Sequence, residues 1–353
     1  MVQVGMGPTM GRSARPEKPS GSIETCPALA PADWSIIWSR TMRVAVIGAG
    51  GVGGYFGGRL AQAAHEVHFV ARGEHLRAIR DRGLRVRSVR GDFEVRAEAS
   101  DDPAEIGPCD YVLFCVKSFD TKEAASKLAP LLHAETAVIS LQNGIDNEEV
   151  IAAEIGWEHV MGGVAFIFAS IAEEPGVIED RGGPARIVFG EWDGQESMRG
   201  TRLLEMFREA GVDASVSSTI RQVLWNKLAF ICAQAGMTAA TGLPIGEIRD
   251  APQAWAMFRR VVEEVAAVAA AEGVDLGADA VDRHVRFAEQ LEPDGRSSLD
   301  HDKAHGRRME LEALHGTVVR LARKHAIPSP ASEAIYALLQ PWALRNEKAA
   351  SRT

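Results

Sequence analysis

The chain has 353 residues, of which 46% are hydrophobic and 25% charged, so it carries enough apolar material for normal globular cores. This length favours two domains. The formal net charge of -9 gives no support to a nucleic-acid partner. No apolar run approaches the roughly 18 residues that a membrane-spanning helix needs. We therefore expect neither a nucleic acid nor a membrane as a partner.

The cysteines favour a reducing environment. Cys26, Cys109, Cys115 and Cys232 have the spacing of neither a zinc ribbon nor a redox pair. Cys115 and Cys232 lie inside apolar runs, which predicts small buried hydrophobic side chains. We expect reduced thiols, no metal site and a cytoplasmic protein.

The N-terminal segment differs from the rest of the chain. Residues 1–41 contain glycine, proline and scattered charge, without sustained periodicity. A secretory signal needs an uninterrupted apolar stretch, which this segment lacks. We interpret it as a disordered or non-native extension, because the folded pattern begins at Met42.

Strands and helices alternate from Met42 onward. Short apolar or β-branched runs predict strands at 43–47, 66–72, 111–116, 136–142, 160–166 and 186–192. Helical patterns lie between several of them, at 54–64, 121–132 and 197–210. Such alternation indicates parallel pairing in a doubly wound sheet.

The pattern changes near Ser218. Beyond it, long stretches rich in Ala, Glu, Arg and Leu predict helices at 220–235, 252–272, 279–291, 299–325 and 330–342. The predicted fold is an α/β Rossmann-like N-terminal domain at 42–218, followed by an all-α C-terminal domain at 219–353. We expect the substrate and catalytic groups in the cleft between them.

A glycine-rich motif follows the first predicted strand. The sequence GAGGVG has the GxGxxG spacing, with a strand before it, a helix after it and a second strand about 20 residues on. In this context the first glycine permits a tight turn, the second admits a pyrophosphate and the third allows close packing. The pyrophosphate then lies at the helix N-terminus. The six expected cofactor contacts are Gly48, Ala49, Gly50, Gly51, Val52 and Gly53.

The end of the second predicted strand favours NADP over NAD. NAD-binding domains usually carry an Asp or Glu there for the ribose hydroxyl, whereas this chain has Arg72. An arginine can pair with a 2′-phosphate. Glu74 follows two residues later and keeps NAD open as the alternative.

Four later segments resemble the ketopantoate reductase family, the 2-dehydropantoate 2-reductases. They are VLFCVKSFDT at 112–121, SLQNG at 140–144, VLWNKLAF at 223–230 and RSSLDHDKAHGRRMELEALHG at 296–316. The resemblance runs from Met42 to about residue 340. It implies that NADPH gives a hydride to C2 of a 2-keto acid, a step toward pantothenate and coenzyme A.

The resemblance also implies roles for particular residues. Lys227 corresponds to the general acid, and Glu310 to the acidic residue near the substrate oxygen. Ser298 corresponds to a substrate-binding serine. Asn143 is expected near the nicotinamide and the substrate, and Lys117 at a strand end beside the cofactor. A lysine in an apolar cleft suits this chemistry, because burial lowers its pKa.

The helix that carries the lysine departs from the family. Ketopantoate reductases proper have asparagines four and eight residues after the lysine, where this chain has Ile231 and Ala235. These positions share a helix face with Lys227. Gln234 faces nearly the same way and is the candidate replacement for one lost amide. A different, more apolar 2-keto acid is therefore the alternative substrate.

Plainer readings remain open. Ser297 and Asp300 fit an S-x-x-D capping box without any substrate. His301 and His305 have helical metal-ligand spacing but no third ligand placed by sequence. A non-catalytic NADP-binding regulator is a further alternative for the whole chain. The sequence leaves open whether the chain forms a homodimer.

Overall fold

The computed structural model describes residues 41–351, which belong to one compact unit. The expected extension at 1–41 lies outside the described residues, apart from Thr41. Strand β1 (Arg43–Ile47) shows why this part of the chain folds as a buried sheet. Val44 and Val46 enter one apolar core, whereas Ala45 and Ile47 enter another. A strand buried on both faces is typical of a parallel sheet covered by helices.

The main sheet is eight-stranded, with the order β12-β11-β8-β7-β6-β1-β2-β5. Neighbours are parallel, except that β8 and β11 run antiparallel. The Rossmann-like α/β fold predicted for this part of the chain is confirmed. The other strands of this sheet are β2 (Glu66–Val70), β5 (Glu98–Ser100), β6 (Tyr111–Phe114), β7 (Ala137–Ser140), β8 (Val160–Phe166), β11 (Arg186–Glu191) and β12 (Asp213–Val216).

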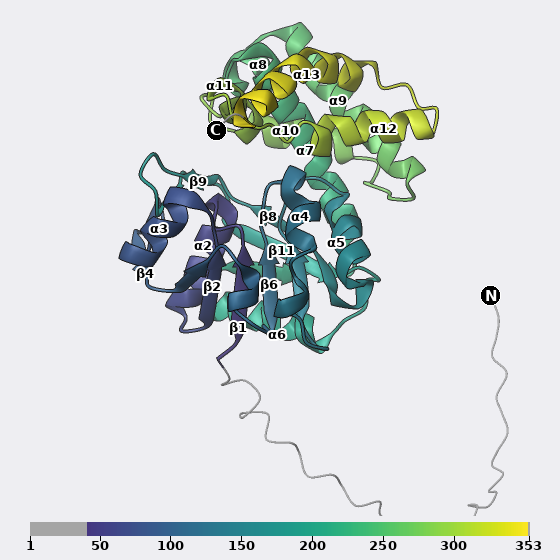
Figure 1. Ribbon diagram of the computed structural model, residues 1–353. Helices are drawn as coiled ribbons and strands as arrows, with labels where there is room; N and C mark the ends of the chain where they lie inside the picture. Colours follow the sequence, from purple (N-terminus) through teal and green to yellow (C-terminus); the bar gives the residue numbers. More distant parts are fainter. Residues whose placement is uncertain (1–40, 352–353) are drawn as a thin grey trace, which may run out of the picture. The chain divides into compact units, whose positions relative to one another are not determined.

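Helices cover both faces of this sheet (Figure 1). Side chains of α2 (Gly51–Gln62), α3 (Gly73–Arg82) and α6 (Met198–Glu209) enter one core. Side chains of α4 (Thr121–Ala125) and α5 (Asn147–Ile155) enter the other. The helix predicted at 121–132 is therefore too long, since α4 ends at Ala125. Short 3₁₀ turns lie at Pro103–Glu105, Ser118–Asp120, Ala129–Leu131 and Trp157–His159.

A second, four-stranded sheet was not predicted. It has the order β4-β3-β10-β9 and consists of β3 (Leu84–Ser88), β4 (Phe93–Val95), β9 (Ala169–Ile171) and β10 (Val177–Asp180). Helix α2 contacts strands of both sheets. A Cβ atom on Gly57 would lie 2.7 Å from Val46 in the main sheet, and one on Gly54 would lie 2.6 Å from Ile178 in the second. The glycines of α2 therefore let one helix pack tightly between two sheets.

The C-terminal part is helical, as predicted, and Figure 1 shows its helices grouped apart from the strands. Its helices are α7 (Ile220–Thr241), α8 (Ile245–Asp250), α9 (Pro252–Ala271), α10 (Ala280–Glu289), α11 (Ser298–Ala304), α12 (Thr317–Lys324) and α13 (Pro330–Ala350). The single helix predicted at 299–325 is wrong. Helix α11 ends at Ala304, Gly306 has a φ of +66°, and helical structure resumes with the π-helical turn Glu312–Gly316.

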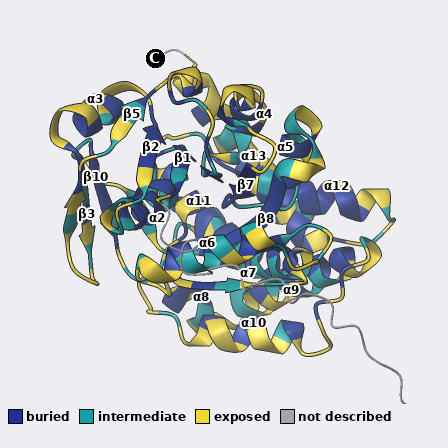
Figure 2. Ribbon diagram, turned by 90° about the horizontal axis from the view of Figure 1, so that it is seen from below, coloured by how far each residue is buried: buried dark blue, intermediate teal, exposed yellow. Residues whose placement is uncertain are grey.

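Burial follows these layers. In Figure 2 the central strands are largely buried, and exposed residues gather on outer turns such as those of α3 and α10. The three described cysteines are free, but Cys115 is only half-buried, in contrast to the prediction. Cys115 follows directly after β6 and lines the large cavity at the carboxyl ends of the strands. Among the described residues no helix is long and apolar enough to cross a membrane.

Candidate active site

A cavity of about 1760 Å³ lies at the carboxyl ends of β1 and β6. The chain passes from β1 to β2 on one side and later adds β6 on the other, so these two strands form a topological switch point. Ligands of open α/β sheets bind at such a point. The cavity is lined by residues 48–52 of the glycine-rich loop and also by residues of α7 and α11.

The glycine-rich loop has the geometry of a dinucleotide-binding turn. Gly48 has a φ of +98°, and a Cβ atom on Gly53 would lie 2.2 Å from the Gly48 carbonyl oxygen. A Cβ atom on Gly50 would meet no atom within 4 Å, so this backbone faces open space. Helix α2 has no side-chain cap and no acidic residue in its first turn. Free N–H groups beside open space fit a bound pyrophosphate.

His75, in the first turn of α3, was missed by sequence reasoning, because a histidine at this position belongs to no motif. Its Nε2 donates to the Ala49 carbonyl at 2.7 Å, and its Nδ1 accepts from the Gly176 N–H at 3.0 Å. Burial lowers the pKa of His75. The neutral ring therefore ties the glycine-rich loop to the loop before β10.

Arg72 and Glu74 lie where α3 begins. Arg72 lines the cavity, and its Nη2 lies 3.2 Å from Oε1 of Glu123. Glu74 is ion-paired with Arg77 on the exposed surface of α3. The carboxylate that the structure places against Arg72 is therefore Glu123, which sequence reasoning did not single out.

Lys227 lies on α7 and lines the same cavity. Its Nζ donates to the Ala165 carbonyl oxygen at 2.8 Å and lies 5.9 Å from the centre of the Phe166 ring. Burial lowers the pKa of Lys227 to about 8, although the charge of Glu310 acts in the opposite direction. An ammonium group with such a pKa can give up its proton near neutral pH.

Glu310 is 6% exposed and lies in the non-helical segment before the π-helical turn. Its Oε2 accepts from Lys117 Nζ at 3.0 Å, and its Oε1 accepts from the Ser118 N–H at 3.0 Å. Burial raises the pKa of this carboxyl, but Lys117 and the Ser118 N–H outweigh it, so the net shift is downward. Asp302, which sequence reasoning also missed, lies 3.1 Å from the same Lys117 Nζ.

Asn143 is positioned by a buried hydrogen-bond network. Its backbone carbonyl accepts from Asn147 Nδ2 at 2.9 Å. Asn147 Oδ1 accepts from Thr121 Oγ1 at 3.0 Å, and that hydroxyl accepts from Gln142 Nε2 at 2.8 Å. Gln142 Nε2 also donates to the Val116 carbonyl at 2.8 Å. The network joins the ends of β6 and β7, so the LQNG turn stands rigidly beside Lys117.

Ser298 and Gln234 line the cavity from the helical side. Ser298 is exposed at the start of α11, whereas Gln234 is 7% exposed on α7. The neighbouring Ser297 is the N-cap, since its hydroxyl accepts from the Asp300 N–H at 3.1 Å. The capping role predicted as a plainer reading is thus confirmed for Ser297, and Ser298 is left facing the cavity.

Comparison with known proteins fits this site. Residues 44–194 match the sequence model of ketopantoate reductase PanE/ApbA, and residues 219–343 match its C-terminal counterpart. The chain belongs to the ketopantoate reductase family. It is therefore an NAD(P)-dependent oxidoreductase of the 2-dehydropantoate 2-reductase type.

Individual relatives share most of their length with this chain. The 2-dehydropantoate 2-reductase of Halobacterium salinarum is 33% identical over 294 residues, covering 82% of this chain and 95% of the relative. The uncharacterized oxidoreductase YkpB of Bacillus subtilis is 30% identical, covering 85% and 99%. The crystal structure of a PanE/ApbA family ketopantoate reductase from Ralstonia eutropha has a TM-score of 0.80 at 37% identity, covering 87% and 100%.

His301 in α11 and His305 at its C-cap have ring centres 4.0 Å apart, with the ring planes tilted to each other. Among the described residues there is no group of three or more His, Cys, Asp or Glu side chains that could hold a metal ion. Both histidines line the large cavity of this chain.

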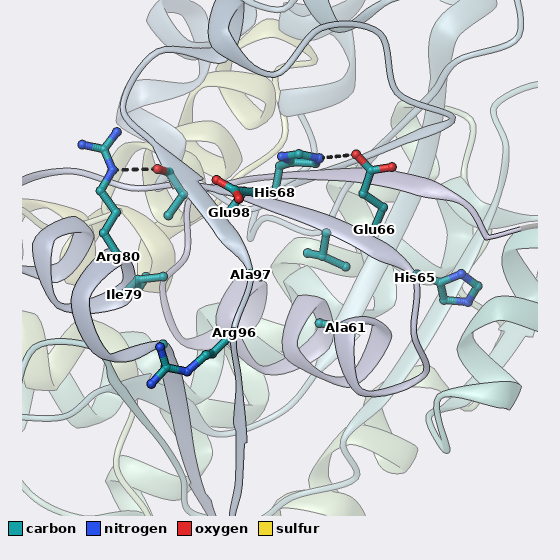
Figure 3. A pocket seen from close by; sticks show the side chains of 12 residues that line it. Ala61, His65, Glu66, His68, Ile79, Arg80, Arg96, Ala97 and Glu98 are labelled. Carbon is teal, nitrogen blue, oxygen red and sulfur yellow. Dashed lines mark hydrogen bonds and ion pairs between the residues drawn. The ribbon is translucent and has the colours of Figure 1, made fainter.

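A second pocket, of about 460 Å³, lies at the opposite edge of the sheet (Figure 3). Glu66 and Glu98, at the amino ends of β2 and β5, line it together with Arg80. Glu66 Oε1 forms a hydrogen bond with His68 Nε2 at 2.8 Å, and Arg80 Nε donates to the Ala99 carbonyl oxygen at 2.7 Å. Dinucleotides bind at the carboxyl ends of parallel strands. The larger cavity, at the carboxyl ends of the strands, is therefore the candidate cofactor site.

Proposed function

We propose that this chain reduces 2-dehydropantoate (ketopantoate) to pantoate with NADPH, and that Lys227 is the general acid. The observation that carries the proposal is the position of Lys227, half-buried in the wall of the cavity that the glycine-rich loop also lines. A lysine whose pKa desolvation lowers to about 8 is suited to hold and release one proton. The reaction supplies pantoate for pantothenate and coenzyme A.

The reaction balances with one proton from the protein. When bound, the reduced nicotinamide supplies a hydride to C2 of the keto acid, and the carbonyl π electrons move to the oxygen. Lys227 gives that oxygen a proton from Nζ and is left as a neutral amine, which takes up a proton from water. General acids of this kind contribute roughly 10²- to 10⁴-fold to the rate. Before this step, the Ala165 carbonyl holds the Nζ in place.

The other site residues bind and orient. Ser298 and Gln234 offer a hydroxyl and an amide to the carboxylate or hydroxyl of the substrate, and Asn143 offers an amide from the sheet side. Lys117 donates to Glu310 and, by lowering its pKa, keeps this carboxylate ionised beside the cavity. A fixed negative charge there stabilises the protonated form of Lys227 until the hydride moves.

Arg72 supports the preference for NADPH, because it lines the cavity at the carboxyl end of β2. A guanidinium group there can pair with a 2′-phosphate.

The direct test is turnover of ketopantoate with NADPH and with NADH, followed through the loss of the reduced-nicotinamide absorbance. Rapid turnover with NADPH, slow turnover with NADH and loss of turnover in Lys227→Ala would support the proposal. Tight NADPH binding without turnover of any 2-keto acid would overturn it and leave a non-catalytic regulator.

A second candidate substrate is a 2-keto acid with a more apolar tail. Ile231 and Ala235 line the cavity one and two turns beyond Lys227, together with Phe230 and Phe287. The two phenylalanine rings meet edge to face with centres 4.9 Å apart. An apolar wall favours an apolar tail, whereas the hydroxyl of ketopantoate would lose hydrogen bonds there. A clear preference for ketopantoate over branched, unhydroxylated keto acids would exclude this candidate.

A further inference from the structure

Two cations from different elements meet at one carboxylate oxygen beside the cavity. Arg72, at the start of α3, places Nη2 3.2 Å from Oε1 of Glu123. Lys127, just beyond α4, places Nζ 2.8 Å from the same oxygen. Both cations line the cavity, at the end that Val70, Asp101 and Pro103 also line. This is the end where the second strand of a dinucleotide-binding domain meets the adenosine ribose.

The shared oxygen fixes how close the two cations are. Since both lie within hydrogen-bonding distance of one atom, their nitrogens are separated by no more than about 6 Å. The terminal oxygens of one phosphate group can accept from two such donors at once. Oxygen Oε1 of Glu123 thus already occupies a position that a phosphate oxygen would take.

An ordinary surface ion pair does not explain the whole arrangement. Lys127 and Glu123 are four residues apart, and helical i,i+4 pairs of this kind are common. Such a pair accounts for one contact only. The helical pair does not explain why Arg72, at the start of α3, contacts the same oxygen. Nor does it explain why Lys127 lines the cavity.

We propose that Lys127 is the second cation of a clamp for the 2′-phosphate of NADPH, and that Glu123 is the carboxylate that this phosphate displaces. The inference rests on the proposed preference for NADPH and assigns a further selectivity residue to it. The side chain of Glu123 is 57% exposed, so it can turn toward solvent when the phosphate arrives. With NADH the carboxylate keeps both cations, and neither binds the cofactor.

The clamp predicts opposite effects from two neighbouring residues. Lys127→Ala should weaken NADPH binding by about fivefold or more, since a charge-assisted hydrogen bond is lost, and should leave NADH binding within about twofold. Glu123→Gln should strengthen NADPH binding, because the competing negative charge is removed, and should not strengthen NADH binding. Lys122→Ala is the matched control, because Lys122 is exposed on the same helix.

Calorimetric titration of the unmodified chain and of each variant with NADPH and with NADH gives two dissociation constants per protein, and the melting temperature confirms that each variant is folded. A loss of affinity in Lys127→Ala that is equal for the two cofactors, or absent for both, would overturn the clamp. So would weaker NADPH binding in Glu123→Gln.

The preference itself is tested separately. Equal affinity of the unmodified chain for NADPH and NADH would overturn the cofactor part of the proposed function and the clamp with it. A preference that Arg72→Ala removes and Lys127→Ala does not would leave the proposed function standing and overturn the clamp alone.

Discussion

Lys117 Nζ lies 3.0 Å from Glu310 Oε2, although the two residues are 193 positions apart in the chain. This ion pair joins the end of β6 to the segment between α11 and the π-helical turn. It gives the Glu310 carboxylate a partner other than Lys227. Lys227 is thereby left with a backbone carbonyl as its hydrogen-bond partner, and burial lowers its pKa.

Loss of Lys117 should destabilise the fold at neutral pH. In Lys117→Met the buried Glu310 keeps only the Ser118 N–H, and we expect a loss of about 1–3 kcal/mol in the free energy of unfolding. The 44% exposure of the Lys117 side chain keeps this figure below that for a fully buried pair. Urea denaturation measures it. The double variant Lys117→Met/Glu310→Gln should recover stability, and additive losses would contradict the argument.

The same pair has a pH dependence of known sign. The pKa of Glu310 is lowered in the folded state, so its contribution is present above the unfolded pKa of about 4.5 and is lost as the pH falls through the folded value. The difference in stability between the unmodified chain and Lys117→Met should therefore shrink below pH 4.5. A difference that stays constant into acid would show that Glu310 is not the group involved.

Lys227 should set the alkaline limit of turnover. A general acid must carry its proton, so with a pKa of about 8 the value of kcat/KM should fall as the pH rises through about 8. Lys227→Arg keeps the charge but cannot lose the proton, which should remove this alkaline limb and lower kcat by about 100-fold or more. Initial rates across the pH range test this prediction. An alkaline limb that persists in Lys227→Arg would assign it to another group.

Substitutions at two glycines of the glycine-rich loop should affect cofactor binding and folding separately. A Cβ atom on Gly50 meets no atom within 4 Å, so Gly50→Ala should keep the melting temperature of the free chain and weaken NADPH binding by about tenfold. A Cβ atom on Gly53 would lie 2.2 Å from the Gly48 carbonyl, so Gly53→Ala should lower the melting temperature itself. Thermal unfolding and cofactor titration of both variants distinguish the two roles. Equal melting temperatures would refute the assignment.

The apolar wall of α7 should control substrate preference. Ile231→Asn/Ala235→Asn would place two amides on the helix face that lines the cavity. The two added hydrogen bonds to a hydroxylated substrate are worth about 1 kcal/mol each, so the ratio of kcat/KM for ketopantoate over an unhydroxylated keto acid should rise about 30-fold. Competition assays give this ratio directly. A ratio that stays unchanged would mean that the substrate tail lies elsewhere in the cavity.

The central sheet and its glycine-rich turn were predictable because each is encoded locally. Residues 43–47 alternate between two cores, and the glycine spacing follows at once, so a short window of sequence contains the whole signal. The second sheet was missed, since β3 and β10 are brief and pair across about 90 residues. No local pattern specifies such a pairing.

The site was predictable only where a motif carried it. Lys227, Ser298 and Glu310 were expected from the family resemblance and are found lining one cavity. His75 and Asp302 were missed, because their partners are a backbone carbonyl and a distant lysine. The break between α11 and the π-helical turn was missed too. That break lets Glu310 reach Lys117, and the many helix-forming Leu and Arg residues of 299–325 hide it.

The π-helical turn limits which residue helix α7 can carry at position 236. His315, buried in that turn, bonds the Cys232 carbonyl at 2.9 Å, and a Cβ atom on Gly236 would lie 2.2 Å from its Nε2. The imidazole therefore fills the space that a side chain at 236 would need. A larger residue at 236 therefore requires a smaller side chain at 315, so position 236 is closed to substitution while His315 is in place.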